Sequence, residues 1–372
     1  MSDRGVYEYI LTGRDDRGRR VTEIVEAHTA DEAVRLFADY GHTEIVLHTD
    51  DNVAPYHHPS KLIKTFTPRD YIGYRTRGRW GCMLFLARKL YMQQWWLYGI
   101  CLAVVVVRRI DGDDWDMFDW FPGLLLLFPA LFTVYCELFS KVIPYRRVLK
   151  AVLRGRWEEV ARNMRRVQMP LPSFERPFRE SQALAGMGRL DEALDHFRPV
   201  ADDPGVPPHM YWTYKGLIYS TAREREKALD CVARAAELAP GNVVALIDHA
   251  LALLTVRNDV GWARERLKEA RQHALSDVSG PLCEYAEGVL ALKDRRPGDA
   301  AELLERSLRG LRPFTGGNPA IGIVIAKIEA NLALAYATNG DHDAALRAYR
   351  KAEPVLTAHD TLELTRCREV LG

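Results

Sequence analysis

The sequence lacks an excess of charge of either sign, because 51 lysines and arginines stand against 50 aspartates and glutamates. Such a chain releases few counterions from a phosphate backbone, so nucleic acid is not expected among its partners. Cysteine is also scarce: the six cysteines are scattered singly, with no C-x-x-C pair and no histidine cluster at metal-ligand spacing. We therefore expect reduced, structural cysteines, with no metal site and no cofactor.

Phosphate-binding, hydrolase and metalloprotease motifs are missing as well. The Gly316–Gly317 pair lacks the Lys-Ser/Thr that follows in a phosphate-binding loop, and neither G-x-S-x-G nor H-E-x-x-H occurs. His57 and His58 stand together in a proline-containing stretch, but no further ligands are spaced to complete a metal site there. Acidic pairs such as Glu158–Glu159 are typical of solvated protein surface. The sequence thus predicts a protein that is not an enzyme and has no catalytic residues.

Long apolar stretches occur only in one part of the chain. Two uncharged runs, 95–107 and 120–136, lie close together, and five of the eight tryptophans fall from Trp80 to Trp120. A bilayer core of about 30 Å needs about 20 helical residues, a length that the flanking residues supply. Tryptophan and tyrosine bracket both runs, as is typical of a membrane interface. The pattern predicts a transmembrane helical hairpin over residues 80–143; a helical hairpin buried inside a soluble domain is the alternative.

Lysine and arginine predict the orientation of this hairpin. They concentrate before the first run and after the second, whereas the connecting loop has only Arg108 and Arg109. By the positive-inside rule, both termini then face the cytoplasm. The first 20 residues have no apolar signal segment, so no cleaved signal peptide is expected. The expectation is a multi-pass protein of a bacterial inner (plasma) membrane, with its unpaired cysteines in a reducing compartment.

Residues 5–49 predict a strand, a second strand, a helix and a third strand. VYEYILT and VTEIVEA are rich in β-branched and aromatic residues, and they flank a turn that contains Gly18. Thr29 and Glu32 have capping-box spacing at a helix start, and Gly41 ends that helix before TEIVLHT. The sequence therefore predicts a small ββαβ module over residues 1–50 and a proline-containing linker over 51–79.

The motifs of this module, YEY, D-x-x-G, VEA and DEA, resemble the leading segment of membrane platform proteins of type II secretion and type IV pilus assembly. Glu23 stands where that family usually has glycine. The resemblance implies a docking module of an envelope complex. Packing on the rest of the chain is the alternative, because a segment of this size buries little core of its own.

Past residue 144 the chain repeats itself. A small residue or valine recurs at intervals of 33, 35, 35, 37 and 45 residues, close to a 34-residue period with one insertion near 310–322. These positions are Val160, Ala193, Ala228, Ala263, Ala300 and Ala345. One copy also has Trp212, Gly216 and Tyr219, and this copy resembles a tetratricopeptide repeat (TPR). The resemblance implies a TPR-type α-solenoid over residues 144–372, in which stacked helix pairs create the core and a last helix covers the end.

In tetratricopeptide repeat proteins the first helix of each pair lines an inner groove. The resemblance places the following residues there: Met210, Thr213, Leu217, Ser220, Asp248, Thr255, Tyr285 and Leu292. This lining is mainly apolar and lacks the lysine, arginine and asparagine with which some members grip a terminal carboxylate. It suits an amphipathic helix or extended segment of a partner. The alternative is a groove that is filled by the chain's own insertion near 310–322 or nearly closed.

Together these patterns predict a mainly α protein: a ββαβ module, a two-helix transmembrane hairpin and a TPR-type α-solenoid. The expected function is a membrane-anchored scaffold or adaptor for protein–protein interaction on the cytoplasmic side, with an unidentified protein or peptide partner and the lipid bilayer as a second partner. One alternative is a subunit or assembly factor of a secretion, pilus or other envelope complex. Another is a soluble or peripheral regulator with the apolar hairpin buried in protein.

Overall fold

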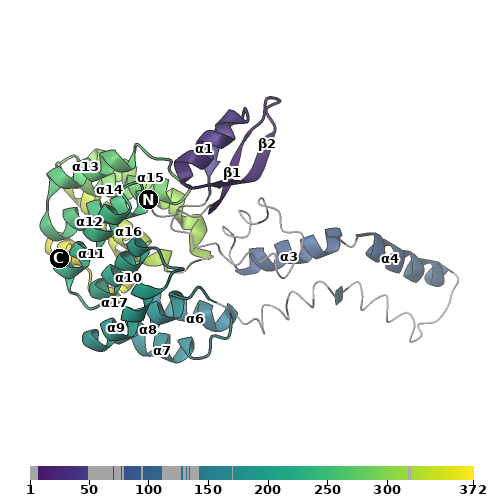
Figure 1. Ribbon diagram of the computed structural model, residues 1–372, viewed down its shortest axis with the longest axis horizontal. Helices are drawn as coiled ribbons and strands as arrows, with labels where there is room; N and C mark the ends of the chain where they lie inside the picture. Colours follow the sequence, from purple (N-terminus) through teal and green to yellow (C-terminus); the bar gives the residue numbers. More distant parts are fainter. Residues whose placement is uncertain are drawn as a thin grey trace.

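The structure is a computed structural model that describes residues 7–48, 70, 77, 79–93, 95–110, 127–128, 131, 134, 142–169, 171–316, 318 and 320–372. It is mainly helical, with a small sheet at the amino-terminal end (Figure 1). Most of the expected linker and most of the second apolar run lie outside the described residues.

A three-stranded antiparallel sheet and one helix form the amino-terminal module, and the strand order is β2-β1-β3. Its elements are β1 (Tyr7–Arg14), β2 (Arg20–Ala27), α1 (Ala30–Asp39) and β3 (Thr43–Leu47). Thr29 caps α1, because its hydroxyl accepts a hydrogen bond from the Glu32 amide at 3.2 Å. Tyr9, Leu11 and Phe37 are buried between the sheet and the helix. The ββαβ order predicted from the sequence is confirmed.

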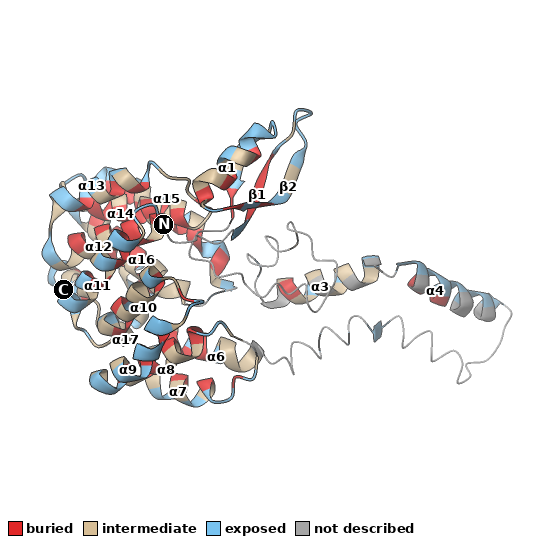
Figure 2. Ribbon diagram, viewed as in Figure 1, coloured by how far each residue is buried: buried red, intermediate tan, exposed pale blue. Residues whose placement is uncertain are grey.

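Two helices, α3 (Arg79–Gln93) and α4 (Trp95–Ile110), extend away from the helical body (Figure 1). Much of α4 is exposed (Figure 2). Among the described residues, one helix is long and apolar enough to cross a membrane, and that helix is α16 (Ile321–Thr338) of the repeat array. The predicted two-helix hairpin is therefore not confirmed by helix length, and most of its second half lies outside the described residues.

Antiparallel helix pairs form the rest of the structure. Within the described residues the six pairs are α6 (Val142–Leu153) with α7 (Trp157–Met164), α8 (Glu175–Gly186) with α9 (Leu190–Phe197), α10 (Pro208–Thr221) with α11 (Arg225–Leu238), α12 (Val243–Ala252) with α13 (Val260–Ala270), α14 (Ser279–Lys293) with α15 (Pro297–Leu311), and α16 with α17 (His342–His359). A further helix, α18 (Leu362–Leu371), packs on α16 and α17. Short 3-10 helices follow α9 (Arg198–Asp202) and α15 (Arg312–Gly316), and a π-helical turn (Leu253–Arg257) ends α12.

The predicted period corresponds to one recurring position in these pairs. Each of the six aligned residues is the fourth residue of the second helix of its pair. Five of them are completely buried, and Ala228 is half-buried. The opposite helix comes very close: a Cβ built on Gly288 would lie 2.7 Å from Leu304 Cγ, and one on Gly216 would lie 3.3 Å from the Ala228 carbonyl oxygen. Small residues are therefore needed where the two helices of a pair touch, and the predicted array of stacked helix pairs is confirmed.

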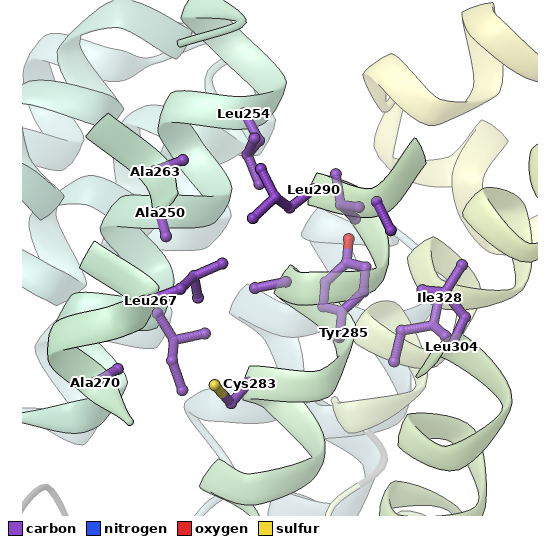
Figure 3. Close-up of a cluster of buried hydrophobic side chains, with 14 of the residues drawn as sticks. Ala250, Leu254, Ala263, Leu267, Ala270, Cys283, Tyr285, Leu290, Leu304 and Ile328 are labelled. Atoms are coloured by element: carbon purple, nitrogen blue, oxygen red, sulfur yellow. The ribbon is translucent and has the colours of Figure 1, made fainter. Parts of the chain in front are cut away.

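The largest buried apolar cluster lies between α12, α13, α14 and α15 and reaches α16 (Figure 3). Leu254, Leu267, Leu304 and Ile328 are at most 3% exposed there. Each pair contributes one apolar face that it could not bury alone, so the core is continuous across successive pairs.

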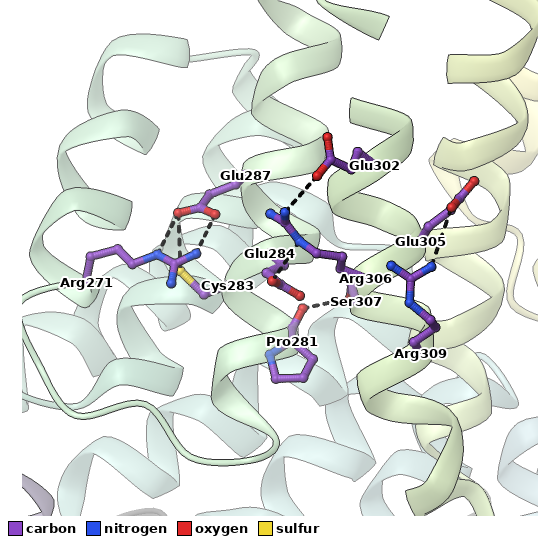
Figure 4. Close-up of polar contacts among 10 residues, drawn as sticks. All are labelled: Arg271, Pro281, Cys283, Glu284, Glu287, Glu302, Glu305, Arg306, Ser307 and Arg309. Atoms are coloured by element: carbon purple, nitrogen blue, oxygen red, sulfur yellow. Dashed lines mark hydrogen bonds and ion pairs between the residues drawn. The ribbon is translucent and has the colours of Figure 1, made fainter. Parts of the chain in front are cut away.

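Polar contacts also join successive helices (Figure 4). Arg271, which caps the carboxyl end of α13, pairs with Glu287 of α14 at 2.6 Å, and Arg306 of α15 pairs with Glu284 of α14 at 3.1 Å. These ion pairs are partly exposed and so contribute little stability each. They favour one relative position of the helices, whereas the stability of helix packing comes mainly from the apolar cluster.

Candidate partner-binding groove

The array curls until its last pair contacts its first. Ile323 of α16 packs on the buried cluster of α6 and α7, and a Cβ on Gly322 would lie 2.8 Å from Leu153 Cδ1. At the carboxyl end of α17, His359 Nε2 lies 3.3 Å from the Leu153 carbonyl oxygen, and its ring meets that of Trp157 edge-on at 5.7 Å. The inner side of the array is consequently lined by α16 and α18 as well as by the first helices of earlier pairs.

Helix α18 contacts two of the predicted groove residues. Arg366 donates from Nη2 to the Thr255 carbonyl oxygen at 3.2 Å, within the π-helical turn that ends α12. The ring of Tyr285 is 3% exposed, and burial raises its pKa well above the ordinary value, with Glu363 adding to the rise and Arg366 opposing it. Both groove residues therefore face the chain's own last helix.

Asp248, the charged residue of the predicted lining, lies within the electrostatic influence of Lys327 on α16. Burial raises the pKa of its carboxyl group to about 6, and the positive charge of Lys327 on α16 opposes that rise. Partial removal of the ionised carboxylate from water costs free energy of folding, and the surrounding helix contacts offset that cost. Asp248 is half-buried.

The other predicted residues fall into two groups. Met210 is 5% exposed in the core between α8, α9 and α10, and Leu292 packs partly buried on the largest cluster. Thr213 is half-buried and donates to the His209 carbonyl oxygen of its own helix at 3.0 Å. Leu217 is 44% exposed and Ser220 is also exposed, so α10 presents them to solvent.

The inner surface thus has an open part on α10 and a part covered by the chain's own carboxy-terminal helices. The prediction that these residues bind a partner stays a prediction. The part around Tyr285 and Thr255 faces the last helix, α18, whereas the sequence-based alternative named the insertion near 310–322 as the filling segment. The period predicts which residues point inward, whereas the covering helix depends on contacts between residues far apart in the chain.

A second contact region joins the amino-terminal module to the array, and no sequence motif marked the residues that form it. The amino-terminal module docks on the loop between α13 and α14, where Asp31 accepts from His273 Nδ1 at 2.7 Å and from the Ala274 amide at 2.6 Å. On the same loop, the Asp277 carboxylate lies 2.8 Å from His48 Nδ1, and the Asp277 amide donates to the Leu47 carbonyl oxygen at 2.9 Å. The module therefore packs on the array, which was the alternative to a free docking module.

Over the described ranges no three histidine, cysteine, aspartate or glutamate side chains group so as to hold a metal ion. His57 and His58 lie outside those ranges.

Comparisons with known proteins give no close relative. No protein-family model matches the sequence, and no curated protein matches it. Among solved structures, the crystal structure of the APC/C hetero-tetramer Cut9-Hcn1 matches with 14% sequence identity and a TM-score of 0.30. The match covers 59% of this chain and 48% of that chain, so this chain spans about half the length of the structure it matches. The assignment of a repeat fold rests on the helix pairs themselves.

Proposed function

We propose that this protein is a helical-repeat scaffold that is anchored in an inner (plasma) membrane and binds protein partners on the cytoplasmic side. The observation that carries the anchoring is the contrast between a repeat array that buries its apolar side chains and a helix, α4, that exposes them.

Large apolar side chains are exposed along the whole of α4. They are Trp95, Trp96, Ile100, Leu102, Val106, Val107 and Ile110, each at least 45% exposed. Soluble monomers rarely expose an apolar surface of this extent, and a bilayer is a solvent in which it is stable. The described residues of the second run, Leu127, Phe128, Leu131 and Val134, are likewise at least 41% exposed. A helix of 16 residues spans about 24 Å, so flanking residues would complete the crossing.

The scaffold part of the proposal is supported by the shape of the array. Stacked helix pairs present extended surfaces on which partner segments dock without any change in the core. The open inner surface on α10, with Leu217 and Ser220, is the part of the predicted groove that a partner can reach.

A role in a secretion, pilus or other envelope assembly is a second proposal. Its support is the resemblance of the amino-terminal segment to platform proteins, together with the finding that this segment forms a folded ββαβ module over residues 7–47. Recovery of the chain as a single species from membranes in mild detergent would count against this role.

The anchoring is tested by fractionation of cells that express the full chain. We expect the protein to stay with the membrane pellet after extraction with alkaline carbonate, and the repeat array to resist protease added to spheroplasts. Release by carbonate would disprove membrane insertion, and digestion of the array from outside would disprove the orientation.

Partner binding is tested separately, by proximity labelling from the array in intact cells. Leu217→Asp should abolish labelling of the partner that the wild type labels. Leu238→Asp, an equally apolar exposed position on α11 at 38% exposure, is the matched control and should leave labelling unchanged. Equal labelling by all three proteins would disprove a role of the α10 surface.

A further inference from the structure

A hollow of about 330 Å³ opens between α15 and α17, and α16 forms its floor. Its lining residues are Glu305, Leu308, Arg309, Arg312, Glu329, Leu332, Tyr336, Ala344, Arg347, Ala348 and Lys351. We call it the α15–α17 furrow. Leu308 and Leu332 are 4% and 6% exposed, so the floor is apolar and closely packed, whereas the rim carries the charges.

Both carboxylates of the furrow already have partners. Glu305 accepts a hydrogen bond from the Tyr336 hydroxyl at 2.6 Å and pairs with Arg309 at 3.6 Å, and Figure 4 shows this ion pair on α15. The side chain of Glu329 is 11% exposed and pairs with Arg312 at 3.3 Å. Burial, followed by the hydrogen bond to Glu305, raises the pKa of Tyr336 to about 12, so its hydroxyl remains a donor at neutral pH.

The α17 wall of the furrow carries two cationic side chains without an ion-pair partner among the described residues. Arg347 and Lys351 lie one turn apart on α17, and neither forms an ion pair with any residue that the structure describes. Like charges at this spacing on a helix repel each other. With four cationic and two anionic side chains, the lining has a formal charge of +2. The uncompensated charge is concentrated at Arg347 and Lys351.

We infer that the α15–α17 furrow binds an acidic segment of a protein partner, whose carboxylates lie over Arg347 and Lys351 and whose aliphatic stems lie on Leu308 and Leu332. This inference rests on the proposed scaffold function and names the chemistry of the partner. Single carboxylates fit better than a phosphate group, because Glu305 and Glu329 in the same lining repel a dense double charge. The apolar floor favours a side chain with a methylene stem over an inorganic ion.

The test is a binding titration with the full chain in detergent micelles. One probe is a fluorescein-labelled peptide of glutamate, alanine and leucine, and the other is the same peptide with every glutamate replaced by glutamine. We expect saturable binding of the acidic peptide by fluorescence anisotropy and a loss of at least about tenfold in affinity for the glutamine peptide. Equal affinity for the two peptides, or no binding of either, would overturn the inference.

Variants of α17 locate the site. Arg347→Glu combined with Lys351→Glu should weaken binding of the acidic peptide at least about tenfold, by reversing the two uncompensated charges. Arg350→Glu changes the charge of the same helix at an exposed position outside the furrow, so it should change affinity less than about twofold. A similar loss in both proteins would overturn the assignment to the furrow. Arg347→Gln with Lys351→Gln, which adds no repulsion, should also weaken binding and would keep the test valid if the reversed variant unfolds.

Competition with inorganic phosphate at constant ionic strength distinguishes the ligand class. Phosphate at the concentration of a control chloride salt should displace no more peptide than chloride does. If phosphate displaced more peptide than chloride does, the furrow would be a phosphate site, and the inference that it binds carboxylates of a protein segment would be overturned. Because these titrations use purified protein in detergent, they succeed or fail independently of the membrane fractionation that tests the anchoring.

Discussion

Helices α16 and α4 are both strongly apolar, yet they occupy opposite environments. Helix α16 has the length and composition of a membrane-spanning helix, but it is packed inside the repeat array, where Ala326, Ile328 and Ala330 are at most 3% exposed. Helix α4 is two residues shorter than α16, at 16 against 18, and exposes most of its large side chains. Length and composition therefore do not separate the two helices, whereas burial does.

The polar residues of α16 explain why it belongs in protein. Glu329 is paired with Arg312, and the Asn331 amide donates to the Lys327 carbonyl oxygen at 2.8 Å. The Asn331 bond stays within α16, but hydrocarbon would offer Glu329 no partner such as Arg312, and an unpaired carboxylate there is very costly. The described large side chains of α4 between Trp96 and Val107 are, in contrast, all apolar or aromatic.

The largest effect is expected from Ala330→Asp in α16. The new carboxylate would be fully buried without a partner, so the array should lose about 4 kcal/mol or more of its free energy of unfolding. Chemical denaturation of the full chain, followed by circular dichroism, measures the loss. A midpoint equal to that of the wild type would show that α16 is not in a core.

The same substitution in α4 should act on membrane binding and not on the array. Ala103 is exposed at the middle of α4, and aspartate at the centre of a membrane-spanning helix costs about 3 kcal/mol. We expect Ala103→Asp to increase the fraction released by alkaline carbonate while the unfolding midpoint of the array stays unchanged. Unchanged retention of Ala103→Asp on the membrane would show that α4 does not lie in the bilayer.

A pair of glycines sharpens the contrast at the level of packing. A Cβ on Gly288 would lie 2.7 Å from Leu304 Cγ, whereas nothing lies within 4 Å of one on Gly99 in α4. Gly288→Ala should therefore destabilise the array by about 1–3 kcal/mol through overpacking, and Gly99→Ala should not. Thermal unfolding of both variants checks this; a neutral Gly288→Ala would mean that the pair of α14 and α15 can separate.

The smallest effect concerns the charge of Asp248. Because the folded pKa of Asp248 is raised to about 6 from 3.8, the folded state favours the protonated form. Stability from this group is present below pH 4 and is lost as the pH rises through 6. Asp248→Asn should then stabilise the protein at pH 8, but not at pH 4, by on the order of 1 kcal/mol, since the half-buried carboxylate keeps some contact with water. Denaturation at both pH values measures it. The exposed Asp202→Asn is the control, and the same gain at pH 4 would contradict the burial argument.

Local signals made much of the fold predictable. The cap at Thr29 and the β-branched and aromatic residues of the strands are encoded within a few residues, and the recurring residues at Val160, Ala193 and their successors follow from helix pairs that touch at one fixed position. Their periodic recurrence revealed the array without any relative.

The candidate site was less predictable, because it depends on contacts across the chain. Arg366 and Thr255 are 111 residues apart, and Asp31 and His273 are 242 apart. No periodicity links such residues, so the period placed Tyr285 inward but did not show which helix covers it. The furrow was missed for a similar reason: its charges come from three helices and spread over residues 305–351.

The contact of His359 with Leu153 has a consequence for how the array denatures. In a linear stack the outermost unit has a single neighbour, so it frays first and the stack melts progressively from its ends. Here the two terminal units brace each other, and neither end can peel off while the other is intact. Hydrogen exchange should accordingly reveal one global opening event for the array in place of a gradient of protection from its tips to its centre.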